Sequence, residues 1–279
     1  MIGLMRRLHL LLALAWSLMP SVALPLTWGD VLEPAPGTPQ AIGSYTAGCV
    51  QGAIPLPSEG RGYQVMRPQR RRFFGHPQLV RYVQELGAAT KHAGLGMLLI
   101  GDLGQPRGGP MPSGHRSHQN GLDADIWFWL PGDGMILSVA ERDAIGAPSM
   151  LAAAGGGIDA QQWSQRQAEV LRLAAGFEVV ARIFINPVIK KALCEQFPGA
   201  SWQQKLRPWW GHDDHFHVRL RCPAGQTACQ DQDLLPAGDG CGAELAWWFS
   251  EEARTPQPPV APTKVPLPAA CEAVLRKSR

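Results

Sequence analysis

The chain has 279 residues, of which 45% are hydrophobic and 18% charged, and 26 Lys and Arg against 23 Asp and Glu give a net charge of +3. This composition provides one sizeable core and too little basic charge for a nucleic-acid binding surface. The 31 glycines and 25 prolines indicate long loops and extended segments. A coiled coil, a polytopic membrane protein and a disordered chain are therefore excluded.

Residues 1–23 have the pattern of a secretory signal peptide. Arg6 and Arg7 precede a mostly apolar stretch over residues 8–19, and small residues at 21–23 offer a cleavage site. The apolar stretch is shorter than the roughly 20 residues that cross a bilayer, so an uncleaved anchor is the weaker alternative and no stable membrane insertion is expected. We expect an exported chain that begins at residue 24 with a charge of 24 − 23 = +1.

All six cysteines lie in the expected mature chain: Cys49, Cys194, Cys222, Cys229, Cys241 and Cys271. An even number in an oxidising compartment predicts three disulfides, and the absence of a C-x2-C pair argues against a cysteine metal site. The sequence leaves 15 pairings open, among which the short turn between Cys222 and Cys229 favours a local bridge. Cys271 follows a Pro-rich segment, which it would tie back to the body of the protein.

The elements predicted along the chain are short strands and separated helices. Residues 24–65 are rich in Gly, Pro and Ser and predict an irregular surface segment, whereas helical spacing predicts a helix over 77–92. An apolar run predicts a buried strand over 97–100. Residues 131–160 predict either a lid-like insertion or a disordered excursion.

Further helices are expected over residues 163–175 and 188–197, with a short strand over 183–185 between them. The mixture predicts a single α+β domain over residues 24–253, with a small antiparallel sheet flanked by helices and long disulfide-tied loops. Residues 254–279 are expected to form an extended Pro-rich tail with no core of its own.

Five of the eight histidines fall in two short segments: His115 and His118 in the first, His212, His215 and His217 in the second. Residues 122–130, after the first segment, and residues 215–221, which include His215 and His217, alternate apolar and polar side chains. This alternation predicts two half-buried strands. If the strands pair, their polar faces bring Asp125 and the histidines into one cleft. A lone histidine is more often structural, but two clusters beside a carboxylate favour a metal site.

Imidazole and carboxylate ligands suit Zn2+, and a catalytic zinc usually takes three protein ligands. The pattern favours His118, Asp125 and His217 as those ligands, His215 as general base, and His115 as a fourth contact or a partner behind the ligands. His212, or a tryptophan N–H, is expected to polarise the substrate carbonyl. Arg219 and Arg221 are expected to bind a substrate carboxylate. Trp209 and Trp210 line a substrate groove or pack in the core, and Asp123 is expected in a turn or on a solvated face.

Longer motifs surround these residues: Ser113-Gly-His115-x-Ser-His118-Gln-x-Gly-Leu-Asp-x-Asp125 and His215-Phe-His217-Val-Arg-Leu-Arg-Cys-Pro223. Shorter ones are Tyr63-Gln-Val-Met-Arg67, Arg72-x-Phe74-Gly-His-Pro77, Leu99-Ile-Gly-Asp102, Arg182-Ile-Phe-x-Asn-Pro187 and Gly238-Asp-Gly-Cys-Gly-Ala-Glu244. Together they resemble the penicillin-insensitive murein endopeptidases over essentially all of the mature chain.

That family belongs to the zinc peptidases of the lysostaphin and D-Ala-D-Ala peptidase type. The resemblance implies a periplasmic enzyme that cuts D-alanyl–meso-diaminopimelyl cross-links of peptidoglycan. It implies His118, Asp125 and His217 as zinc ligands, with His215 in the base position and His212 nearby. It further implies the disulfides Cys49–Cys271, Cys194–Cys241 and Cys222–Cys229. Residues 152–157 lack the Asp and His that the family can carry in this loop, so no second metal is expected there.

A zinc-dependent DD-endopeptidase is therefore expected. Penicillin should not inhibit it, because no G-x-S-x-G nucleophile motif is present and no serine takes part in the reaction. Two alternatives remain. A D,D-carboxypeptidase would share the metal site but have a different cleft, and a non-catalytic murein-binding protein would keep the metal for structure alone.

Overall fold

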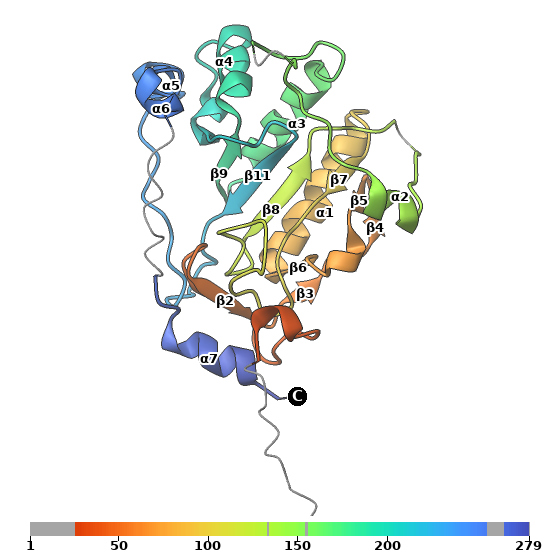
Figure 1. The fold of residues 1–279 in the computed structure, drawn as a ribbon, viewed down its shortest axis with the longest axis vertical. Coiled ribbons are helices and arrows are strands. Elements are labelled where there is room, and N and C mark those ends of the chain that lie inside the picture. The colour runs from red at the N-terminus through yellow and green to blue at the C-terminus, as the bar shows by residue number, and fades with distance from the viewer. Residues whose placement is uncertain (1–25, 133, 154–155, 256–264, 279) are drawn as a thin grey trace, which may run out of the picture.

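A seven-stranded sheet forms the centre of the computed structural model, which describes residues 26–132, 134–153, 156–255 and 265–278 (Figure 1). The expected signal peptide, residues 1–23, lies outside this range. The strand order is β10-β9-β11-β8-β7-β5-β4. The bounds are β4 Glu59–Gly60, β5 Tyr63–Val65, β7 Leu98–Ile100, β8 Asp123–Trp127, β9 Val180–Ile185, β10 Leu206–Pro208 and β11 His215–Leu220. The sheet is larger than expected and mixed, because β10 runs parallel to β9 and β5 parallel to β7.

The strands β8 and β11 are antiparallel neighbours at the middle of the sheet, as their alternation predicted. Their register pairs His217 with Asp125 and Arg219 with Asp123. On its other side β11 pairs with β9, which places Phe184 opposite His217. All five residues of β8 are buried, so this strand is covered on both faces rather than half-buried.

Helices α1, Pro77–His92, and α3, Gln165–Gly176, cover one face of the sheet. Their apolar side chains pack with Ala124, Ile126, Phe216 and Val218 of the two central strands in one core. The sequence predicted α1 with the same bounds, and His76 caps it by accepting a hydrogen bond from the backbone N–H of Gln78. The helix α4, Pro187–Gln196, follows β9 as expected.

The N-terminal region is more regular than its composition suggested. A hairpin of β1, Gln40–Gly43, and β2, Gly48–Gln51, lies beside the main sheet, and β3, Ile54–Pro55, pairs with β6, Phe74–Gly75. Short 3-10 turns occur at η1 Trp28–Asp30, η2 Pro68–Arg70 and η3 Ser201–Lys205. The expectation of an irregular segment holds for residues 26–39, which contain only η1, but was wrong for residues 40–65, because these strands are too short to show alternation.

The segment 131–160 packs against the body in the parts that the structure describes. It contains α2, Val139–Ala144, whose Arg142 is buried and ion-paired with Glu59 at 2.9 Å. Met150 is fully buried, and its backbone N–H donates to the carbonyl of Asp213. A disordered excursion is therefore the wrong alternative for these described parts, which adjoin the turn before β11.

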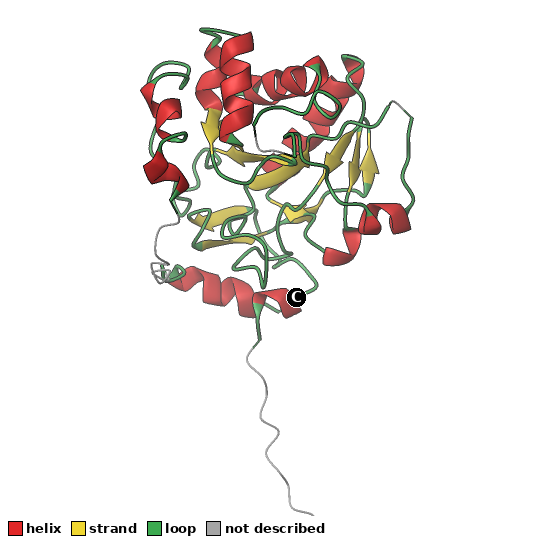
Figure 2. Ribbon diagram, turned by 45° about the horizontal axis from the view of Figure 1, so that its top comes forward, coloured by secondary structure: helices red, strands yellow, loops and turns green. Residues whose placement is uncertain are grey.

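The C-terminal region ends in a packed helix rather than an extended tail. The helix α7, Ala269–Arg276, lies along β2 at the lower end of the molecule, apart from the helices at the upper end (Figure 2). Cys271, Val274 and Leu275 are buried there, and the Cys49–Cys271 disulfide joins α7 to β2. Two short helices precede it, α5 Ala243–Trp247 and α6 Glu251–Arg254. The expectation of a tail without a core was wrong for α7, since its Pro-rich approach hid the helical spacing.

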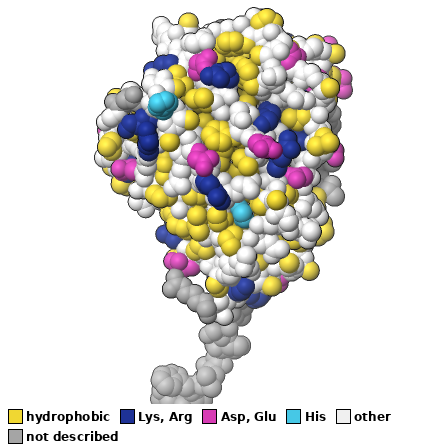
Figure 3. Space-filling model, turned by 180° about the vertical axis from the view of Figure 1, so that it is seen from behind, with side chains coloured by type: hydrophobic (Ala, Val, Ile, Leu, Met, Phe, Trp, Pro, Cys, Tyr) yellow, Lys and Arg dark blue, Asp and Glu magenta, His cyan; other side chains and the backbone are white. Residues whose placement is uncertain are grey.

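All six cysteines form disulfides, and the other two are Cys194–Cys241 and Cys222–Cys229. The three pairs are those that the family resemblance implied, and the α+β class is confirmed. Seen from behind, acidic and basic side chains are interspersed rather than gathered by sign (Figure 3). Among the described residues, no helix combines the length and hydrophobicity that a membrane crossing requires.

Candidate metal centre

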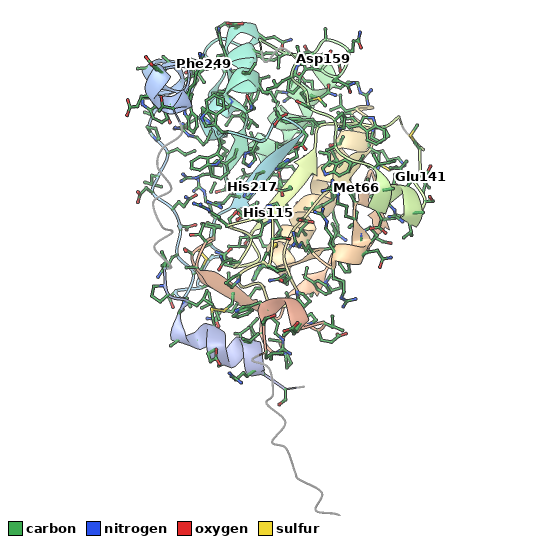
Figure 4. All side chains as sticks on the ribbon, viewed as in Figure 1. Met66, His115, Glu141, Asp159, His217 and Phe249 are labelled. Carbon is green, nitrogen blue, oxygen red and sulfur yellow. A yellow bond between two sulfur atoms is a disulfide. The ribbon has the colours of Figure 1, made fainter. Side chains whose placement is uncertain are left out.

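Both histidine segments reach the face of the sheet opposite α1 and α3. Figure 4 shows His115 and His217 close together near the middle of the sheet, with Met66 on their flank. The register of β8 and β11 places Asp125 beside His217, and the loop before β8 brings His118 to the same point. Residues almost 100 positions apart in the chain therefore meet because two central strands pair.

Three imidazole nitrogens surround one carboxylate oxygen of Asp125. His217 Nδ1 lies 3.0 Å from Asp125 Oδ1, His118 Nε2 lies 3.4 Å from it, and His215 Nε2 lies 3.7 Å from it. His118 is fully buried, and Asp125 and His217 are each only 4% exposed. Side chains buried to this extent normally satisfy their polar atoms.

Two polar atoms at this point lack the hydrogen bonds that burial demands. Neither His118 Nε2 nor Asp125 Oδ1 has a hydrogen-bond partner among the described residues, and the same holds for His217 Nε2, which faces Asp123. Leaving a buried acceptor unsatisfied is unfavourable by about 1–3 kcal/mol. His118 Nε2 and Asp125 Oδ1 face a common point, so a ligand bound there would supply the interactions that these two atoms lack.

The loop that carries His118 is held in a strained conformation. His118 has φ = +67°, a left-handed conformation that non-glycine residues rarely adopt and that concentrates at functional sites. Its backbone N–H donates to Asp123 Oδ2 at 3.0 Å, and its Nδ1–H donates to the carbonyl of Leu103. The Leu103 contact leaves the lone pair of Nε2 directed at Asp125.

His115 joins the cluster from its more exposed side. Its Nδ1 lies 3.5 Å from Asp125 Oδ2, and its Nε2 lies 2.9 Å from Asp102 Oδ2. Arg72 also binds Asp102, at 2.9 Å. Burial raises the pKa of Asp102, but His115 and Arg72 more than offset this and lower the pKa to about 2. Asp102 is therefore a fixed negative charge that orients His115.

Asp123 lies behind the cluster, fully buried. Its Oδ1 is 3.4 Å from His217 Nε2, an electrostatic contact without a hydrogen bond that favours the ring orientation with Nδ1 towards Asp125. Burial opposes ionisation of Asp123, but Arg219 and His217 hold its pKa well below the usual value. The expectation of a turn or a solvated face for Asp123 was wrong, because alternation reports the face of a strand but not the depth of a residue.

Arg219 lies in this buried layer rather than in the cleft. It is 4% exposed, and its Nε and Nη2 donate to the two carboxylate oxygens of Asp123 at 2.8 and 3.0 Å. Its Nη1 donates to Gln232 Oε1 at 2.7 Å. The guanidinium is therefore engaged on all sides, and the structure does not support a substrate carboxylate on Arg219. Arg221, two residues further, is exposed.

His215 pairs with an acidic residue on its outer side. Its Nδ1 is in contact with Asp214 Oδ1, which leaves Nε2 facing Asp125. Burial lowers the pKa of His215, but Asp125 and Asp214 outweigh burial and raise the pKa to about 9. A cation bound at Asp125 would cancel part of this effect and favour the neutral imidazole.

His212 and Trp210 lie beside His215, and their polar atoms point differently from the expectation. The ring of His212 lies 5.0 Å from that of His215. Burial and the neighbouring histidines lower the pKa of His212 to about 4, so the ring is neutral at pH 7. Its Nδ1 lies 3.2 Å from the carbonyl of Trp210, which makes Nδ1 the donor and leaves Nε2 as an acceptor. Trp210 donates its own N–H to the carbonyl of Ala253. Neither side chain is therefore placed to donate to a carbonyl.

The donor set fits a divalent metal ion. One ligand atom each of His115, His118 and Asp125 lies within 4.8 Å of the other two, and His217 Nδ1 lies 3.0 Å from Asp125 Oδ1. Metal–nitrogen bonds of about 2.0–2.1 Å in a tetrahedral site separate ligand atoms by about 3.3 Å. The distances of 3.0 and 3.4 Å around Asp125 Oδ1 agree with that separation.

Three acidic residues of the site escaped sequence reasoning: Asp102, Asp123 and Asp214, the last of which holds His215. Asp123 shares the polar face of β8 with Asp125 and stands opposite Arg219 in the register, which would have indicated an ion pair. Asp102 follows a buried strand that adjoins β8, but its contact with His115 depends on the path of a loop. Only the loop coordinates could reveal that contact.

The chain belongs to the penicillin-insensitive murein endopeptidase family, whose model matches residues 41–276, and it is therefore an enzyme of the peptidase class. It is similar to the penicillin-insensitive murein endopeptidase of Yersinia enterocolitica, with 45% identity over 89% of this chain and 90% of the relative. A relative of the same name from Pectobacterium atrosepticum is 42% identical over 95% of both chains. Another from Klebsiella pneumoniae is 44% identical over 95% of this chain and 96% of its own.

Proposed function

We propose that the chain is a zinc-dependent endopeptidase that hydrolyses D-alanyl–meso-diaminopimelyl cross-links of peptidoglycan. The convergence of His118, His217 and His215 on Asp125 Oδ1, at 3.0–3.7 Å, is the observation that carries the proposal. The names of the relatives, which denote murein endopeptidases, support the substrate class. The ligands would be His118, Asp125 and His217.

The donor set favours zinc over the hard cations. Calcium and magnesium prefer oxygen ligands and higher coordination numbers, whereas two imidazoles and one carboxylate are typical of catalytic zinc. When bound, zinc polarises a scissile carbonyl and lowers the pKa of a water molecule towards 7. His115 stays a fourth contact or a partner that orients Asp125.

His215 is placed to move the proton. Its Nδ1 is held by Asp214, so Nε2 accepts a proton from the attacking water and delivers it to the departing amine. The carboxylate of Asp214 stabilises the imidazolium that exists between these two transfers. His212, neutral with Nε2 as acceptor, would take a hydrogen bond from an N–H of the substrate.

Export of the chain belongs to the same proposal. Peptidoglycan lies outside the cytoplasmic membrane, so residues 1–23 would direct the chain to the periplasm and be removed. The three disulfides suit that oxidising compartment. The peptidase domain would then span residues 24–253, with residues 254–279 tied back to it by Cys271.

Digestion of purified cross-linked sacculi, with and without a chelator, tests the proposal by mass analysis of the soluble products. We expect cross-linked muropeptide dimers to be converted to monomers, the chelator to stop this, added zinc to restore it, and penicillin to leave it unchanged. Release of free alanine alone would indicate a D,D-carboxypeptidase instead. Binding to sacculi without any soluble product from the zinc-loaded chain would indicate a murein-binding protein.

A further inference from the structure

Four tryptophans gather beside the candidate metal centre, on the side where Phe184 contacts His217. Trp209 and Trp210 follow β10, whereas Trp247 and Trp248 come from the end of α5. The ring of Trp248 lies 5.9 Å from those of Trp209 and Trp210 and 5.3 Å from that of Trp247. Trp209, Trp210 and Trp247 are 54%, 41% and 46% exposed. Clustered exposed aromatic rings of this kind mark binding surfaces. We call these four residues the tryptophan patch.

The tryptophan patch is continuous with the histidine cluster. Trp209 lies 6.0 Å from the ring of Phe184, and Phe184 lies 5.4 Å from His217 and 6.3 Å from His212. An unbroken row of rings therefore leads from the candidate metal ligands to the protein surface. A ligand on the patch would lie next to a substrate in the cleft.

Several contacts hold α5 and α6 in place beneath these rings. The Cys194–Cys241 disulfide joins the segment to α4, and Glu244 forms an ion pair with Arg207 of β10. The buried Lys190 donates to the carbonyl of Asp239 at 2.6 Å, and Trp210 donates to that of Ala253 at 3.3 Å. A surface fixed in this way loses little conformational entropy when a ligand binds.

We propose that the tryptophan patch binds the glycan strand of peptidoglycan beside the cleavage site, an inference that rests on the proposed function. Hexosamine rings present flat C–H faces that stack on indole rings, and their acetamido groups need no charged partner. The glycan is uncharged, because its lactyl carboxyl groups are used in amide bonds to the stem peptides. The peptides carry free carboxylates, which the neighbouring α6 disfavours because its exposed Glu251 and Glu252 outnumber its one exposed Arg254.

Uncharged oligomers of N-acetylglucosamine, which share the hexosamine rings and acetamido groups of the glycan strand and carry no lactyl carboxylate, are the probe for binding. We expect the wild-type chain to bind them, Trp247→Ala to bind about fivefold or more weakly, and Trp247→Tyr to keep most of the affinity because it keeps an aromatic face. Leu234→Ala, which truncates a 90% exposed apolar side chain outside the patch, is the matched control and should bind as the wild type does. Thermal unfolding confirms that each variant is folded.

A second readout separates this proposal from the proposed function. We expect Trp247→Ala to lower the ratio of cleavage rates on intact sacculi and on a glycan-free cross-linked peptide dimer. Two outcomes would overturn the proposal for the tryptophan patch and leave the proposed function standing. These are equal glycan binding by the wild type and Trp247→Ala, and no glycan binding by a wild-type chain that cleaves the dimer. Self-association that Trp247→Ala abolishes would overturn it as well, by showing that a second copy covers the patch. Failure of the zinc-loaded wild type to cleave the dimer would instead reject the proposed function.

Discussion

The two faces of β8 and β11 are buried alike but built for different purposes. On one face Ala124, Ile126, Phe216 and Val218 pack under α1 and α3 in the main core. On the other, Asp125 and His217 are equally buried, yet they meet at a point where polar atoms lack hydrogen-bond partners. The pairing of β8 with β11 thus stabilises the fold through the apolar face and brings the candidate metal ligands together on the polar face. Substitutions on the two faces should therefore affect different measured quantities.

The largest effect on activity is expected from Asp125→Asn. The amide has the same shape but no charge, so metal affinity and cross-link cleavage should fall by more than the ~10–100-fold typical of residues behind the ligands. Metal titration and muropeptide analysis measure both quantities. Glu195→Gln, a change at a 69% exposed carboxylate, is the control and should behave as wild type. Full cleavage by a folded Asp125→Asn chain would contradict the ligand role.

The largest effect on stability is expected on the opposite face, from Phe216→Ala. Removal of this 1% exposed ring should lower the free energy of unfolding by about 3–5 kcal/mol through the lost burial and the cavity. Its neighbour His215→Ala, on the polar face, should lose cleavage, and its free energy of unfolding should fall by less than that of Phe216→Ala, because no apolar core residue is removed. If both variants lost stability equally, the two faces would not have separate purposes.

An intermediate effect is expected where the polar face supports the ligands. Asp123→Asn should weaken zinc binding about 10–100-fold, because His217 loses the carboxylate that orients its ring. The same change should destabilise the chain, because Arg219 keeps its charge while buried. Zinc titration and urea unfolding of the metal-free chain separate the two effects. Unchanged zinc affinity would show that Asp123 supports the fold alone.

The smallest effect concerns pH and Asp102. Its pKa is about 2 in the folded chain against an ordinary 3.8, so its ionised form contributes stability above pH 4 that is lost as the pH falls towards 2. Converted into free energy, this difference between the folded and the ordinary pKa of Asp102 adds about 2 kcal/mol to the stability of the folded chain. Asp102→Asn should therefore be less stable than wild type at pH 7, with a difference that narrows between pH 4 and pH 2 in urea unfolding without metal. A difference that stays constant over this range would contradict the ion pairs at Asp102.

Sequence patterns captured what local spacing encodes. The bounds of α1, the polar faces of β8 and β11, and the meeting of Asp125 with His217 all follow from periodicity and pairing, whereas the position of His118 depends on the loop before β8. The burial of a residue and its interaction partners do not follow from periodicity. For this reason Arg219 was expected in the cleft and Asp123 in a turn or on a solvated face. The strands β3 and β5 depend on the partners β6 and β7, which lie further along the chain, and the docking of α7 depends on the Cys49–Cys271 disulfide.

Titration of the metal-free chain with Zn2+, with cross-link cleavage followed at each addition, tests the central claim most directly. The account predicts one zinc ion per chain and cleavage that rises in proportion and levels off at one equivalent. Full cleavage by the metal-free chain, or saturation with zinc without any cleavage, would contradict it.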